Sequence, residues 1–165
     1  MKERKLDDLI TDYINGNKEV FNEIYYKTYN SVYLSIKIII KDHDIIKDLI
    51  QETYMKALDN LLKYQKGTNF NAWISKIARN ISINYYNREK KIEYKEDNNP
   101  IFNIESKDSK LNYYLQFLDD EEKDVIIYHL VLNMKFKEVS EIINKPLSSV
   151  FLIYKKAIEK IKKSL

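Results

Sequence analysis

Apolar and polar positions alternate with the period of an α-helix along most of the chain. The segments 6–15, 18–40, 44–64 and 70–90 each place their apolar residues on one side of a helix. Shorter helical patterns follow at 111–117, 121–132 and 136–143, and a last one runs from 148 to the end. The stretch 92–109 shows neither a helical nor a strand period and contains Pro100, which is typical of a linker. The pattern predicts an all-α protein with two small helical domains, 1–91 and 110–165, joined by a flexible linker at 92–109.

The amino-acid composition agrees with a helical fold and indicates the cellular compartment. The 165 residues include only two glycines and two prolines, too few for a sheet with tight turns. There is no cysteine, so disulfides, thiolate nucleophiles and cysteine-liganded zinc are excluded. The start MKERKLDD has no apolar stretch typical of a signal peptide, and SIKIIIK is shorter than the ~20 apolar residues that span a bilayer. We therefore expect a cytoplasmic protein without a membrane span.

The chain lacks the usual signatures of an active site. It contains no phosphate-binding loop, no dinucleotide fingerprint and no nucleophile elbow. His43 and His129 are far apart in the sequence, and each is more typical of a surface or capping residue than of a metal ligand. Asp48 and Glu52 lie four residues apart on a helix, with no nucleophile or third ligand nearby. We expect a protein that is not an enzyme and needs neither a cofactor nor a metal.

The predicted 44–64 helix has an unusual polar side. Leu49, Ile50 and Thr53 fall on the side typical of a core. The opposite side gathers acidic and amide side chains around a methionine: Asp48, Gln51, Glu52, Met55 and Asp59. An exposed methionine within an acidic patch is not required by folding and raises the question of what meets it.

The predicted 70–90 helix carries a basic strip. Its apolar stripe contains Phe70, Trp73, Ile74, Ile77 and Ile81. The opposite side mixes basic, amide and aromatic residues: Lys76, Arg79, Asn80, Tyr86 and Asn87. Such a strip suits nucleic acid, because cations hold phosphates and aromatic rings stack on unpaired bases. A solvated helix face has the same composition, and Trp73 fits a core anchor better than a stacking platform.

The last two helical patterns have the dimensions of a helix-turn-helix. The segment 136–143 and the segment from 148 onward are separated by the turn NKPL. Val139, Ile142 and Ile143 point inward, and Ser140 allows a close helix crossing. A helical hairpin that caps a bundle fits the same pattern. The lysine-rich tail favours DNA binding, because its ammonium groups suit phosphate contacts.

Three segments together resemble a known family. DLIQETYMKALDN, YQKGTN and FNAWISKIARNISINYYNREKK are similar, in this order, to the second conserved region of bacterial RNA polymerase sigma factors. The similarity is to the small two-domain kind, the extracytoplasmic-function sigma factors. EVSEII and KPLSSV resemble that family's fourth region. The resemblance implies a transcription-initiation factor that directs RNA polymerase to specific promoters by binding and opening promoter DNA.

The resemblance also assigns candidate binding residues. The acidic side would dock on the clamp helices of the largest subunit of core RNA polymerase through Asp48, Gln51, Glu52 and Met55. Contacts to the −10 promoter element are expected from Tyr64, Lys66, Thr68, Asn69, Lys76, Arg79, Asn80, Asn84, Tyr86, Asn87 and Arg88. Contacts to the −35 element are expected from Ser148, Ser149, Leu152, Lys155, Lys156 and Lys163. An anti-sigma factor is a further candidate partner.

The chain departs from the family pattern at two places. Asn84 stands where family members usually have an acidic residue, and Phe151 and Ile153 replace the lysine and arginine that usually open the recognition helix. Two alternatives therefore stay open. One is a degenerate sigma-like interaction protein that binds polymerase or an anti-sigma factor without reading a promoter, and the other is a stand-alone helix-turn-helix regulator.

Overall fold

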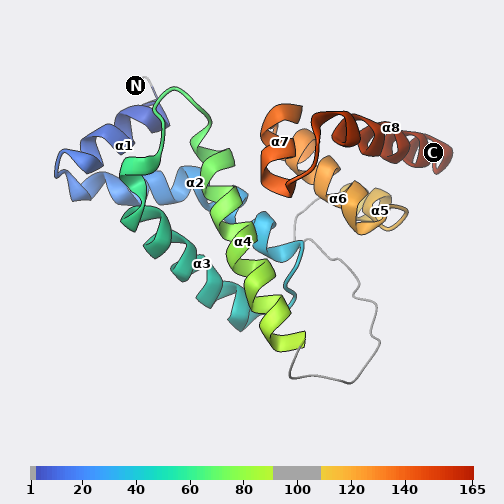
Figure 1. Ribbon diagram of the computed structural model, residues 1–165, viewed down its shortest axis with the longest axis horizontal. Coiled ribbons are helices and arrows are strands. Elements are labelled where there is room, and N and C mark those ends of the chain that lie inside the picture. Colours follow the sequence, from blue (N-terminus) through green and yellow to red (C-terminus); the bar gives the residue numbers. More distant parts are fainter. Residues whose placement is uncertain (1–2, 91–108) are drawn as a thin grey trace.

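The structure, a computed structural model, describes residues 3–90 and 109–165, and every element in these stretches is helical (Figure 1). The first stretch contains α1 (Leu6–Ile14), α2 (Phe21–Lys37), α3 (His43–Asp59) and α4 (Phe70–Lys90), with short 3-10 turns at Lys18–Val20 and Leu61–Lys63. The second contains α5 (Ser109–Leu115), α6 (Asp120–Ile126), a π-helical turn at Ile127–Val131, α7 (Phe136–Ile143) and α8 (Leu147–Lys163). The predicted all-α class is confirmed.

Element ends follow local capping chemistry more closely than the apolar period. The Asp42 side chain accepts hydrogen bonds from the amides of Asp44 and Ile45 at 2.9 and 3.1 Å, so α3 begins after it. The helix predicted at 44–64 ends early, at Asp59, and the chain tightens into a 3-10 turn. Of the predicted linker at 92–109, only Ser109 lies among the described residues, so the domain boundaries stay predictions.

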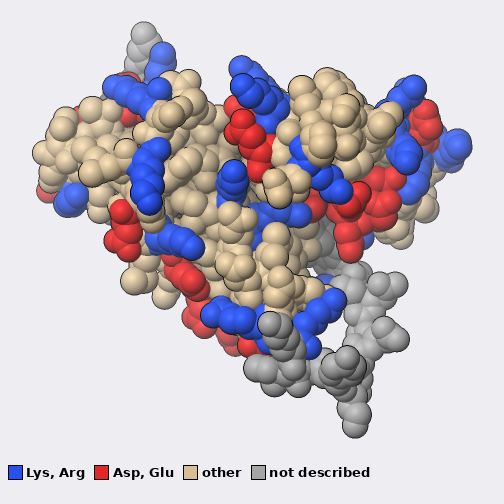
Figure 2. All heavy atoms as spheres, in the orientation of Figure 1, with Lys and Arg blue, Asp and Glu red and all other residues tan. Residues whose placement is uncertain are grey.

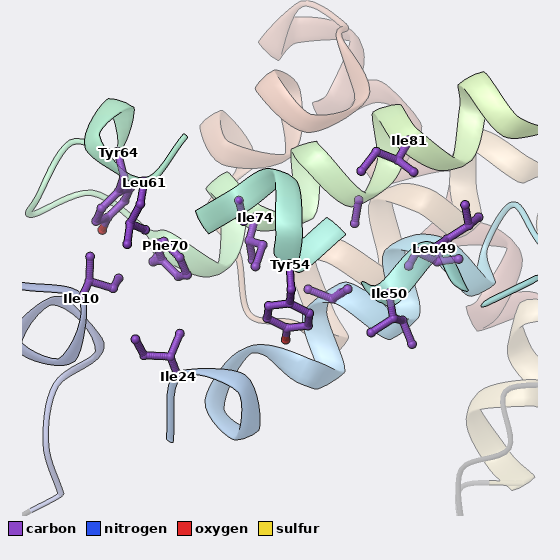
Figure 3. Packing of buried hydrophobic residues seen from close by; sticks show 14 of the residues in the cluster. Ile10, Ile24, Leu49, Ile50, Tyr54, Leu61, Tyr64, Phe70, Ile74 and Ile81 are labelled. Carbon is purple, nitrogen blue, oxygen red and sulfur yellow. The ribbon is translucent and has the colours of Figure 1, made fainter. Parts of the chain in front are cut away.

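The helices α1 to α4 share one apolar core (Figure 3). Ile10 of α1, Ile24 of α2, Ile50 of α3 and Ile74 of α4 are each at most 5% exposed. Tyr54 of α3 is buried among them, and burial raises its pKa, because the ionised phenolate would lose its hydration. This bundle fixes the relative positions of α3 and α4.

The helices α7 and α8 form the predicted helix-turn-helix. Val139 and Ile142 of α7 pack with Val150 of α8, and all three are buried. Asn144 ends α7 in the left-handed conformation, with φ of 54° and ψ of 49°. The Ser140 hydroxyl donates to the carbonyl of Lys145 at 2.6 Å, so the small residue expected at the crossing also ties the turn.

The two helical groups pack against each other. Leu34 of α2 is 3% exposed and lies in a cluster with Leu115, Ile126 and Ala157 of the second group. Ala72 of α4 packs against the cluster that contains Val139 of α7 and Val150 of α8. In Figure 1, α7 lies beside α4. One side of α4 is therefore covered by the C-terminal helices.

Candidate polymerase and nucleic-acid interface

The acidic side of α3 lies at the surface. Asp48, Gln51 and Glu52 are exposed, and the Met55 side chain stands out with 68% exposure. Leu49, on the opposite side of the helix, is buried. Figure 2 shows acidic side chains following α3 along the lower left edge. The predicted orientation is confirmed: core residues point inward and the acidic patch meets solvent.

A polar strip along α4 lies next to this acidic face. The exposed candidates on α4 are Lys76, Asn80, Asn84, Tyr86, Asn87 and Arg88. Tyr86 is 41% exposed, and the Lys90 ammonium lies 4.8 Å from its ring centre, whereas Tyr85 packs on the core. Of the two neighbouring tyrosines, Tyr86 is the one available for stacking, as helical phase predicts.

A shallow cavity joins the two faces. Its volume is about 430 Å³, and Glu52 and Lys56 of α3 line it together with Asn84, Asn87 and Arg88 of α4. The predicted polymerase-binding patch and the predicted DNA-binding strip are thus contiguous. A partner on α3 would lie within reach of a nucleic-acid strand that follows the C-terminal half of α4.

The prediction that Arg79 lies on an exposed face is wrong. Its side chain is 14% exposed, and Nη2 donates to Oδ2 of Asp124 on α6 at 2.8 Å. Burial raises the pKa of Asp124, although the Arg79 charge opposes that rise. At Arg79 burial works against the charged form, but the charges and hydrogen bonds of Asp124 and Tyr128 together outweigh it, so the pKa lies above its usual value. The covering element is α6, a segment that the helical period of α4 says nothing about.

The loop between α3 and α4 presents only part of its predicted set. Lys66 and Thr68 are exposed, whereas Tyr64 is 9% exposed and packs edge-on against Phe70, so it does not offer its ring to solvent. Asn69 is half-buried: Oδ1 accepts from the amide of Ala72 at 3.2 Å, and Nδ2 donates to Glu138 of α7 at 3.2 Å. Asn69 therefore helps to begin α4 and also contacts the second helical group.

A lysine-rich cavity lies at the start of α4, and the sequence pattern predicted only one of its lysines as a contact residue. Its volume is about 960 Å³, and it lies between the loop, α1 and α7. Five lysines line it, Lys5, Lys63, Lys76, Lys135 and Lys137, and they outnumber the three carboxylates of Asp7, Glu138 and Glu141. Of the lysines only Lys76 was a predicted contact, because the others stand in unrelated segments and only the fold brings them together. Clustered ammonium groups favour a polyanion such as a nucleic-acid backbone.

The helix α8 presents a mixed surface. Ser148, Lys155, Lys156 and Lys163 are exposed, and Ser149 is half-buried. Leu152 is 61% exposed and Phe151 is 49% exposed, with the Phe151 ring 4.5 Å from that of Phe136. The first turns of this helix therefore offer apolar surface where base-reading residues would be expected.

Residues 26–92 match the family described as sigma-70 region 2. This part of the chain is therefore similar to sigma-70 factors, and the relatives described below include one of the extracytoplasmic-function type. No helix in the described stretches has the length and apolar character needed to cross a bilayer.

Curated relatives and solved structures agree with this assignment. The extracytoplasmic-function RNA polymerase sigma factor SigM of Bacillus subtilis is 28% identical over 134 residues, covering 74% of this chain and 81% of SigM. The sigma factor YlaC of the same organism is 24% identical, covering 100% of this chain and 95% of YlaC. CnrH, solved with the cytosolic domain of CnrY, superposes with a TM-score of 0.67 at 17% identity, covering 95% and 94% of the two chains. The sigma factor RpoE of Bartonella quintana, solved with the anti-sigma factor NepR, gives 0.64 at 18% identity, covering 87% and 94%.

Proposed function

We propose that this protein is a dissociable promoter-specificity subunit that directs RNA polymerase to particular promoters and starts transcription by binding and opening promoter DNA. The observation that carries the proposal is the exposed acidic side of α3, with Met55 at its centre, next to the polar strip of α4. Neither face has a folding role that explains its composition. A basic, partly apolar partner surface explains α3, and a nucleic-acid strand explains α4.

The proposed mechanism uses binding energy alone. Asp48, Gln51, Glu52 and Met55 dock on the clamp helices of the polymerase's largest subunit. The loop and the exposed side of α4 then hold the −10 element, with Tyr86 placed to stack on an unpaired base. Unstacking a base costs a few kcal/mol, which pocket contacts and phosphate neutralisation offset without nucleotide hydrolysis. The protein thus acts in the cytoplasm as a regulatory subunit without catalysis or a cofactor.

We assign binding of the −35 element to the helix-turn-helix, whose α8 surface differs from the usual family pattern. Ser148, Ser149, Lys155, Lys156 and Lys163 supply polar and cationic groups along α8, and Leu152 supplies an apolar contact for a thymine methyl. Lysine contacts to phosphate add affinity but little sequence information. We therefore propose that most promoter selectivity resides in the first domain, 1–91, and that the second, 110–165, mainly adds affinity.

The test is in vitro transcription with core RNA polymerase on fragments of the source genome. Wild type is compared with Asp48→Lys/Glu52→Lys, which reverses the charge of the acidic face. The matched control is Asp8→Lys/Glu19→Lys, which makes the same charge change at two exposed carboxylates near α1. Specific starts that survive in the control and vanish in the α3 double variant support the proposal. Starts that persist in the α3 variant exclude this face as the docking site.

A second candidate function is an interaction module that binds polymerase or an anti-sigma factor without reading a promoter. The observation that favours it is the apolar pair Phe151 and Leu152 at the start of α8. CnrH and RpoE, the two structural neighbours described above, were solved with partner proteins, which supports an anti-sigma factor as a partner here. Core-enzyme binding without any starts would establish this function. Tight binding to duplex DNA without polymerase would instead indicate a stand-alone regulator.

A further inference from the structure

The loop that precedes α4 is tied to the other end of the sequence by one carboxylate. Oδ1 of Asp7, in the first turn of α1, lies 2.7 Å from the hydroxyl of Tyr64, and Oδ2 accepts from the amide of Gly67 at 2.8 Å. Both oxygens of this side chain are therefore used by the loop. The two partners stand 57 and 60 residues later in the chain.

The loop has few other attachments. Gln65, Lys66, Gly67 and Thr68 are all exposed, and Gly67 adopts a φ of 90° that other residues rarely adopt. The loop's own hydrogen bonds close a tight turn, from the amide and hydroxyl of Thr68 to the carbonyl of Gln65. These bonds shape the turn but do not attach it to the bundle. Attachment depends on Asp7 at the loop's middle, on the Tyr64 hydroxyl, which also lies 2.7 Å from the carbonyl of Thr68, and on Asn69 at the loop's end, which donates to Glu138.

Asp7 itself is firmly placed. Its neighbours on α1, Leu9 and Ile10, are 0% and 2% exposed and belong to the bundle core. Tyr64 lies at the same end of that core, next to Leu61 and Ile10 in Figure 3. A buried anchor on one side and a charge-assisted hydrogen bond on the other hold the exposed turn against α1.

We infer that Asp7 is a positioning residue: it fixes the conformation of the loop at 65–69 and, through it, the opening of promoter DNA. The role in opening promoter DNA rests on the proposed function, whereas the role in fixing the loop does not. Asp7 lines the lysine-rich cavity but brings a negative charge to it, which suits a brace for the loop rather than a phosphate contact. A loop held in one conformation before DNA arrives loses less conformational entropy on binding.

The sequence offers a matched control. Asp8 is the neighbouring acid in the same first turn of α1, and it is exposed and does not contact the loop. Any effect of losing a negative charge at the helix start is common to Asp7→Ala and Asp8→Ala. Only Asp7→Ala removes both acceptors of the loop. Asp7→Asn keeps one oxygen acceptor and serves as a gentler second variant, and Tyr64→Phe removes the hydroxyl while keeping the ring.

The first measurement is amide hydrogen exchange of residues 64–70 in the full chain. Hydrogen bonds to a charged group are strong enough that losing them should speed exchange of the loop by about tenfold or more in Asp7→Ala. Asp8→Ala should match wild type, and Asp7→Asn should lie between. Tyr64→Phe removes the contacts of the hydroxyl with both Asp7 and the carbonyl of Thr68, so it should speed loop exchange further in the Asp7→Ala background. Equal loop exchange in Asp7→Ala and Asp8→Ala would overturn the inference.

The second measurement uses the genome fragments that give specific starts with wild type and core polymerase. Each is tested as a duplex and as a heteroduplex with the −10 region left unpaired. We expect Asp7→Ala to lower starts on the duplex about tenfold, with a clearly smaller loss on the heteroduplex and unchanged binding to core enzyme. Equal loss on both templates, or none, overturns a role in DNA opening. If wild type gives no starts, the proposed function fails, and the exchange experiment alone decides whether Asp7 anchors the loop.

Discussion

The acidic side of α3 and the polar side of α4 obey the same helical period but meet different surroundings. On α3, Asp48, Gln51, Glu52 and Met55 all lie in solvent. On α4, the C-terminal half is open around Tyr86, but Arg79 in the middle is paired with Asp124. The difference arises because α7 packs on α4 and Asp124 of α6 pairs with Arg79, whereas α7 does not pack on α3 to a comparable extent.

Facing away from a helix's own bundle and facing solvent are two different properties of a side chain. The period of a helix says which side faces away from its own bundle. It does not say whether a second group of helices covers that side. Arg79 can contact phosphate only if Asp124 is replaced as its partner, so DNA binding through Arg79 requires α6 to move away from α4. Binding through α3 requires no such change.

The largest expected effect comes from removing the charge that pairs with Asp124. Arg79→Ala should lower the free energy of unfolding by about 3–5 kcal/mol, because it leaves a buried carboxylate without a partner. Arg88→Ala, an exposed arginine on the same helix, should change it by less than about 0.5 kcal/mol. Urea unfolding of both variants measures the difference. Equal, small effects would mean that Arg79 is not confined by α6 in solution.

A somewhat smaller effect is expected from the apolar contact between the helical groups. Leu34→Ala should cost about 2–4 kcal/mol, because the leucine is 3% exposed and sits within the C-terminal cluster. The loss should also loosen the groups, which small-angle scattering would record as a larger radius of gyration. Leu62→Ala, at an 84% exposed leucine, is the control and should leave both quantities unchanged. A compact Leu34→Ala variant would show that the remaining contacts, among them Ala72 and the Arg79–Asp124 pair, suffice to hold the two helical groups together.

The same contrast between α3 and α4 shows which features could be predicted from the sequence. The helix at 136–143 appears with its predicted bounds, and Tyr86 rather than Tyr85 is exposed, because both features depend on local periodicity. The burial of Arg79 depends on Asp124, which is 45 residues away. The brace on the loop depends on Asp7, which is 57 residues from Tyr64. Pairings at such distances leave no periodic signal, so they could not be predicted from the pattern.

The lysine-rich cavity could not be predicted from the sequence for a related reason. Lys5 and Lys63 come from the first helical group, and Lys135 and Lys137 come from the second. Each lysine taken alone fits an ordinary solvated position. A cluster becomes visible only once α7 is placed against the start of α4, which is a matter of tertiary packing.

A pH-dependent effect would show the cost of burying Asp124. Since the folded-state pKa of Asp124 is raised, the folded protein holds this proton more tightly than the unfolded chain. The contribution of Asp124 to stability is therefore fully present below its unfolded pKa and is lost as the pH rises through the folded value. Relative to Asp124→Asn, which does not titrate, wild type should lose about 1.4 kcal/mol for each unit by which the pKa is raised. Urea unfolding of both proteins from pH 4 to 7 measures this, and parallel curves would contradict it.

The smallest effect on folding is expected at the acidic face of α3, where the largest effect on binding is also expected. Asp48→Asn/Glu52→Gln removes two exposed charges while keeping side-chain shape, so the free energy of unfolding should change by less than about 0.5 kcal/mol. Binding to core polymerase, measured by fluorescence anisotropy at several salt concentrations, should weaken about tenfold and become less sensitive to salt, because fewer charges are matched across the interface. The pair Asp8→Asn/Glu19→Gln controls for net charge. If both pairs weaken binding equally, the attraction comes from overall charge and the α3 face is not a specific docking surface.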